Sequence, residues 1–178
     1  MGPVAVDRIR GLCFITNFSI NIETTMKKAV YFDITELVCK DVFERDGEKS
    51  WRYFRPVLID FLDWIRAEWE RPVHVNNWKW GGAYDERGLR CNLCPLVKNK
   101  DRLYVSAHIL GAGVDFNIEG ASAHEVRAWL NDNICNFFSK FKKYAPRIRI
   151  ESGVFAPSWV HVDFYDHNEP EIIQYIKP

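Results

Sequence analysis

Two kinds of apolar spacing alternate along this sequence and limit the folds that it can adopt. Between Val57 and Trp69 apolar residues recur every three or four positions, which predicts an amphipathic helix over residues 55–70 that Pro72 helps to end. Ser122-Ala-His-Glu125 has the form of a capping box and opens a second helical pattern. By contrast, Ile148-Arg-Ile150 and Val160-His-Val-Asp-Phe164 alternate between apolar and polar residues, as half-buried strands do. The combination predicts the α+β class, with an antiparallel sheet and helices packed on one of its faces.

Length, composition and charge indicate one globular domain. The chain has 178 residues, of which 47% are hydrophobic and 15% aromatic, and its formal net charge is zero. A balanced charge argues against a dedicated nucleic-acid-binding protein, which normally carries a basic surplus. No apolar run approaches the roughly 20 residues of a transmembrane helix. Residues 1–25 do not form a convincing signal peptide, because Asn17 interrupts their apolar stretch and no small-residue cleavage site follows it. They are expected to be a poorly ordered N-terminal extension. Residues 26–178 then form the functional domain.

Two segments carry the residues with the greatest chemical potential. His108 and Asp115 lie in Ser106-Ala-His-Ile-Leu-Gly-Ala-Gly-Val-Asp115, and His161 and Asp163 lie on one face of a predicted strand. Gly111 and Gly113 allow the backbone to bend back between His108 and Asp115. Two histidines and one carboxylate suit zinc and leave its fourth position open, as catalytic sites do. Isolated His and Asp residues are common, so spacing alone leaves ordinary core or surface roles open.

The cysteines give a weaker signal. The five cysteines have irregular spacing, which is a poor disulfide framework and favours a reducing compartment. Cys91-Asn-Leu-Cys94 is a CxxC motif, but no second CxxC or close His pair accompanies it. We therefore expect ordinary thiols at Cys91 and Cys94.

The combined pattern resembles a known family. Ser-x-His-x-x-Gly-x-Gly-x-Asp-Phe followed by Trp-Val-His-Val-Asp is similar to the motifs of the zinc D-Ala-D-Ala carboxypeptidases, which share their fold with the hedgehog signalling domain. Gly113 stands where the family usually has alanine. Residues 150–163 look most like a phage and prophage branch of peptidoglycan peptidases. The resemblance covers roughly residues 30–165 and implies a hedgehog/DD-peptidase-like fold. It also implies one zinc per chain, held by His108, Asp115 and His161.

The resemblance also implies roles for further residues. Many relatives carry Asp or Glu three residues before the last His, where this chain has Ser158. Glu151 is therefore the candidate general base, with a surface carboxylate as the alternative. Arg90 is the candidate for stabilising the oxyanion, although a solvated loop arginine is an equal alternative. Asp163 and Ser106 are expected to support the metal ligands.

The long segment from Asn76 to Arg102 shows little periodicity, which is typical of functional loops. Its aromatic residues Trp78, Trp80 and Tyr84 are expected either to line a substrate groove or to pack in the core.

The function implied by this resemblance is hydrolysis of a peptidoglycan stem peptide near a D-amino acid, as a carboxypeptidase or an endolysin-type endopeptidase. The chain is expected to act as a monomer. It would be made in the bacterial cytoplasm without a signal peptide, be phage-encoded, and act on the cell wall or travel in the virion. Two alternatives stay open: a non-catalytic zinc-containing module that binds the cell wall, and a structural virion component of the same fold.

Overall fold

The two long helices form where the apolar periodicity predicts them. The computed structural model describes residues 26–165 and 170–177, so residues 1–25 lie outside the description. Helix α3 spans Pro56–Trp69, with proline at its first position, and ends at Glu70 in the left-handed conformation. Helix α5 spans Ala123–Lys140, and the capping box between Ser122 and Glu125 is formed in both directions. Both helix predictions are confirmed.

Short helices dominate the rest of the helical structure. They are α1 (Ile34–Leu37), α2 (Lys40–Asp46), η1 (Gly47–Tyr53), η2 (Trp78–Trp80) and α4 (Pro95–Lys98). Asp33 caps α1. Its carboxylate accepts hydrogen bonds from the backbone and the hydroxyl of Thr35, and an acceptor before the first turn satisfies the free helical N–H groups.

A single five-stranded sheet organises the domain, in the order β1-β2-β4-β3-β5. The strands are β1 (Val73–His74), β2 (Gly113–Ile118), β3 (Ile148–Glu151), β4 (Val160–Asp163) and β5 (Ile173–Ile176). Neighbouring strands are antiparallel except β3 and β5, which are parallel. The α+β class is thus confirmed, whereas the prediction of a purely antiparallel sheet is wrong at this edge. Strand β5 follows β4 in the sequence but lies beside β3 in the sheet. The alternation of apolar and polar residues within a strand does not indicate which neighbour the strand pairs with.

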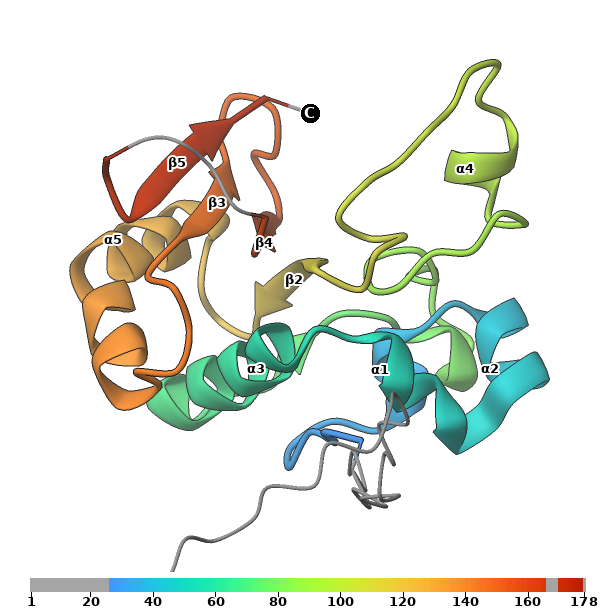
Figure 1. The fold of residues 1–178 in the computed structure, drawn as a ribbon, viewed down its shortest axis with the longest axis horizontal. Helices are drawn as coiled ribbons and strands as arrows, with labels where there is room; N and C mark the ends of the chain where they lie inside the picture. Colours follow the sequence, from blue (N-terminus) through green and yellow to red (C-terminus); the bar gives the residue numbers. More distant parts are fainter. Residues whose placement is uncertain (1–25, 166–169, 178) are drawn as a thin grey trace, which may run out of the picture.

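Helices α3 and α5 pack together on one side of the sheet (Figure 1). Phe61 of α3 links the layers, because its ring lies 6.3 Å from that of Phe116 on β2 and 5.8 Å from that of Phe137 on α5. Trp64 and Trp129 add a second contact between the helices, with ring centroids 5.1 Å apart. This aromatic core fixes which face of the sheet is buried and leaves the opposite face for chemistry.

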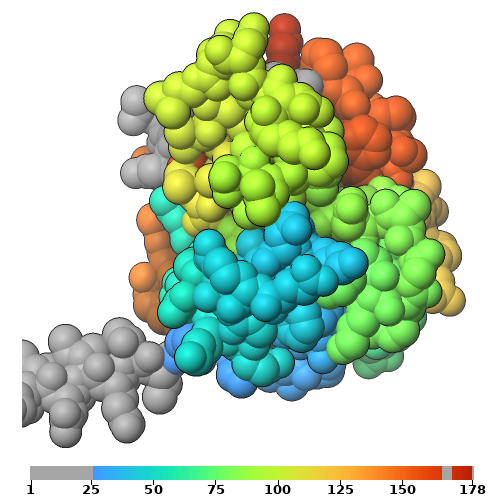
Figure 2. All heavy atoms as spheres, turned by 90° about the vertical axis from the view of Figure 1, so that its right-hand side faces the viewer, coloured from blue at the N-terminus to red at the C-terminus, as the bar shows by residue number. Residues whose placement is uncertain are grey.

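The segment between β1 and β2 is long and carries only η2 and α4. It lies with α1 and α2 at the right of Figure 1, away from α5, and Figure 2 shows residues of this segment against the α1–α2 region. Among the described residues, no helix combines the length and the apolar character that crossing a membrane requires.

Candidate metal centre

Strand alternation places the polar residues of β2 and β4 on the face opposite the helices. Val114 and Phe116 flank Asp115 on β2 and belong to the core, as Val160 and Val162 do on either side of His161. The antiparallel register puts Asp115 directly opposite His161. Since directly opposed side chains lie about 4.5–5.5 Å apart at Cβ, this pairing alone brings two of the three expected ligands together.

His108 reaches the same place from a turn before β2. Gly111 has a φ of +60°, and a Cβ at this position would lie 2.0 Å from the Tyr53 carbonyl oxygen. Glycine therefore permits both the left-handed conformation and the close approach. The backbone N–H of Ala112 then donates to the Ala107 carbonyl at 2.8 Å, which closes the reversal and directs His108 toward β2.

The three side chains converge closely enough to hold a metal ion. His108 Nε2 lies 3.2 Å from His161 Nδ1 and 3.4 Å from Asp115 Oδ2, and His161 Nδ1 lies 2.7 Å from Asp115 Oδ1. Ligands bound tetrahedrally at about 2.0–2.1 Å would stand roughly 3.4 Å apart. All three residues are buried. His108, Asp115 and His161 thus have both the donor types and the spacing of a metal site.

Partners of the outer ring nitrogens orient both histidines toward this point. His108 Nδ1 lies 2.9 Å from the Gly88 carbonyl, which only accepts, so Nδ1 carries the hydrogen and Nε2 is left with its lone pair. His161 Nε2 lies 3.3 Å from Asp163 Oδ2. The same orientation of outer nitrogens toward carbonyls and carboxylates is found around metal-bound histidines.

The electrostatics of the cluster favour a cation. Burial opposes the charged form of His161, but hydrogen bonds to Asp115 and Asp163 outweigh it and raise its pKa to about 9. Burial also opposes ionisation of Asp115, yet the two histidines hold the pKa of this carboxyl well below its usual range. Without a metal ion, the two carboxylates therefore keep a proton on His161 at neutral pH, and a bound metal ion would replace that proton.

Glu151 lies beside the cluster on β3. It follows Ile150, which pairs with Val162 of β4, and its side chain is buried. Burial raises the pKa of its carboxyl, an effect that the nearby His161 partly offsets. Within the described part of the chain, no hydrogen bond or ion pair engages its carboxylate, and it lines a cavity of about 400 Å³ together with His108, Asp115 and His161.

Arg90 and Arg149 bring positive charge to the same cavity. The Arg90 guanidinium donates to Asp115 Oδ2 at 3.0 Å and to the Glu86 carbonyl. Arg90 therefore braces a ligand as well as facing the cavity. Sequence analysis did not single out Arg149, which donates two hydrogen bonds to Asp163 at 2.7 and 2.9 Å. Its position on the polar face of Ile148-Arg-Ile150 was the available signal.

The remaining expected site residues are divided between the site and other parts of the molecule. Ser106 lines the main cavity, and its Oγ accepts from the Ile109 N–H at 3.4 Å, within the turn that carries His108. Tyr84 lines an adjoining cavity of about 290 Å³. Trp78 instead packs against Phe43 and donates to the Val38 carbonyl. Trp80 is 62% exposed and lines neither cavity.

Two features were missed by sequence analysis. Trp159 lines both cavities and forms part of the wall between them, and its place directly before Val160-His161 was the available signal. The structure also brings Cys39 beside Cys91 and Cys94 as a second group that could hold a metal ion. The spacing of these cysteines does not indicate this contact, because several helices and strand β1 lie between Cys39 and the CxxC motif in the sequence.

Comparisons of the chain with protein-family models, with curated proteins and with solved structures find no match.

Proposed function

We propose that the chain is a zinc-dependent peptidase whose substrate is a peptidoglycan stem peptide, cut near a D-amino acid. The observation that carries the proposal is the position of Glu151, a buried carboxylate in the same cavity as the two histidines and the aspartate, which no described residue engages in a hydrogen bond or ion pair. A structural metal site has no need of such a group, whereas hydrolysis needs one that accepts a proton from water.

The residues divide the work as follows. His108, Asp115 and His161 would hold zinc, which when bound supplies a Lewis acid and lowers the pKa of water. Glu151 would take the proton of the attacking water and pass it to the leaving amine. Asp163 keeps His161 oriented, and Arg149 balances the charge of Asp163. Arg90 faces the cavity from the other side and would lie near the developing oxyanion.

The choice of substrate rests on the motif resemblance together with the cavity. A wall of Trp159, Tyr104 and Tyr165 beside Arg149 offers apolar faces and positive charge to a short peptide that carries a carboxylate. The hedgehog/DD-peptidase-like fold, the phage or prophage origin and the monomeric state belong to the same proposal.

One feature favours a second candidate function, binding without catalysis. Ser158 occupies the position where many relatives carry a carboxylate, and its backbone carbonyl accepts from Asn117. If Glu151 does not act as the base, the domain keeps its cavity as a cell-wall-binding or virion module.

The test is mass analysis of purified peptidoglycan fragments after incubation with zinc-loaded protein. We expect cleaved stem peptides with the wild type and none with His108→Ala or with chelated protein. Binding of the fragments without any cleavage by the wild type would overturn the enzymatic proposal and favour the binding module.

A further inference from the structure

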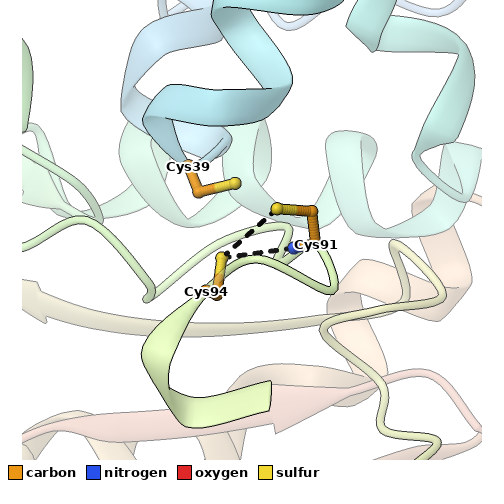
Figure 3. Close-up of side chains that lie close together, drawn as sticks. All are labelled: Cys39, Cys91 and Cys94. Carbon is orange, nitrogen blue, oxygen red and sulfur yellow. Dashed lines mark hydrogen bonds between the residues drawn. The ribbon is translucent and has the colours of Figure 1, made fainter. Parts of the chain in front are cut away.

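Three cysteines from two separate parts of the chain meet between the start of α2 and the long loop (Figure 3). Cys39 directly precedes α2, and Cys91 and Cys94 lie on the turn that leads into α4. Their sulfur atoms all lie within 4.8 Å of one another. Cys39 and Cys94 are buried and Cys91 is half-buried, so the three thiols share a partly dry pocket.

The backbone holds the two segments together. The Leu89 N–H donates to the Leu37 carbonyl at 2.7 Å, and the Cys39 N–H donates to the Leu89 carbonyl at 3.1 Å. At Gly88 the two backbone segments approach so closely that a Cβ would lie 2.0 Å from the Leu37 carbonyl oxygen. Figure 2 shows the same two regions in contact on the surface. The meeting of the thiols is therefore built into the fold.

The spacing of the sulfur atoms suits a shared metal ion. Zinc–sulfur bonds of about 2.3 Å at tetrahedral angles place two sulfurs roughly 3.8 Å apart, and the Cys91 and Cys94 sulfurs are 3.8 Å apart. A disulfide would need about 2.0 Å.

Backbone amides and a carboxylate complete the surroundings of the sulfurs. The N–H of Leu93 donates to Cys91 Sγ at 3.4 Å, and that of Cys91 donates to Cys94 Sγ at 3.2 Å. Such donors stabilise thiolates, which are the form that binds metal. One carboxylate oxygen of Asp41 lies 3.9 Å from Cys91 Sγ.

We propose that Cys39, Cys91 and Cys94 bind a second metal ion, a structural zinc. Their three sulfur atoms are the only donors that this proposal assigns. Thiolate ligands favour zinc over the harder cations, which prefer oxygen.

The position of the second site gives it a defined task. The Gly88 carbonyl that orients His108 and the Arg90 side chain that braces Asp115 both lie next to the anchored segment. The Arg90 N–H also donates to the His108 carbonyl at 3.4 Å. A metal ion at the thiols would fix this loop, which has little regular structure, and thereby position part of the first site.

The test is metal content of the full-length protein, measured per chain by elemental analysis. We expect two zinc ions in the wild type and one in Cys91→Ser and Cys94→Ser. Cys135→Ser is the matched control, because Cys135 is exposed on α5, and it should keep both ions. The double variant His108→Ala/His161→Ala should keep the thiolate-bound ion, which separates this inference from the proposed peptidase function.

Cobalt substitution gives a readout that does not depend on the folding of the serine variants. Cobalt-loaded wild type and the His108→Ala/His161→Ala variant should both show intense near-ultraviolet absorption from thiolate-to-cobalt charge transfer. Absence of this absorption in both proteins would overturn the second site. A Cys91–Cys94 disulfide in protein freshly purified under reducing conditions would overturn it too. Retention of the wild-type metal content in Cys91→Ser and Cys94→Ser would overturn it as well.

Discussion

At the scale of single residues, Glu151 allows the proposed catalysis to be tested separately from metal binding. Its carboxyl lies in the cavity with the ligands but is not among the three residues that converge on the metal position. Glu151→Gln should therefore keep its metal content and lose about 10²–10⁴-fold in kcat. Glu119→Gln, at an exposed residue just beyond β2, is the matched control and should retain full activity. Full activity of Glu151→Gln would show that another group is the base.

The raised pKa of Glu151 sets the direction of two pH effects. The base acts in its ionised form, so kcat/KM should rise with pH as the Glu151 carboxyl ionises, and burial raises the pKa of this carboxyl in the metal-free protein. A carboxyl whose pKa is raised by folding stabilises the folded state below its unfolded pKa, and this contribution is lost as pH rises through the folded pKa. Glu151→Gln should therefore have a thermal transition at pH 7 no lower than that of the wild type. A clearly lower transition would indicate a structural role.

Arg149 shows how much one charged neighbour contributes to the site. Asp163 is almost fully buried, and Arg149 donates two hydrogen bonds to it. Arg149→Met should lower the free energy of unfolding by roughly 2–3 kcal/mol, because a buried carboxylate loses its charged partner. The pair of Arg45 with Asp46 is the matched control, since Arg45 is 68% exposed, and Arg45→Met should destabilise the protein much less than Arg149→Met. Equal losses in urea denaturation would contradict this prediction.

At the scale of elements, the sequence was informative wherever one period persisted over a whole element. The apolar spacing of α3 and the capping box of α5 depend on local chemistry, and both helices occur as predicted. Strand β5 was not predicted, because its position is set by parallel pairing with β3 across the chain. The same limit applied to Cys39, whose contact with the CxxC motif depends on the backbone bridge between Val38 and Leu89. The two histidines and the aspartate, in contrast, stood in two short segments of the sequence, and strand alternation places Asp115 and His161 on one face of the sheet.

Arg127 links α5 to the loop between β3 and β4. Its buried guanidinium donates to the backbone carbonyls of Glu151, Ala156 and Trp159, at 3.0, 2.6 and 2.6 Å. Arg127→Leu would leave these carbonyls without their donor, and we expect a loss of at least about 3 kcal/mol in urea denaturation. Arg127→Lys keeps the charge but not the branched geometry of the guanidinium, so its stability should fall between those of the wild type and Arg127→Leu. A loss below 1 kcal/mol for Arg127→Leu would show that water or another donor replaces the guanidinium.

At the scale of the whole molecule, the aromatic core and the candidate metal centre share the same strands. Phe116 and Phe164 are the sequence neighbours of Asp115 and Asp163, and each ring packs against Phe61, at 6.3 and 5.4 Å. The core side of each strand thus fixes the height and tilt of the polar residue that faces the cavity. This arrangement explains why the helices can lie far from the chemistry and still determine its geometry.

Phe61→Ala tests this dependence on the core. Removing a fully buried aromatic ring should lower the free energy of unfolding by about 3–5 kcal/mol, which corresponds to roughly 6–20 °C in the thermal transition of a domain of this size. The void left by the missing ring would lie against Phe116 and Phe164, whose neighbours are Asp115 and Asp163. The affinity for zinc at His108, Asp115 and His161 should therefore fall as well. Phe155→Ala is the control, since Phe155 is 41% exposed and should change stability by less than about 0.5 kcal/mol. If Phe61→Ala lost stability but kept wild-type zinc affinity in titration calorimetry, the β2 and β4 backbones alone would hold the ligands in place.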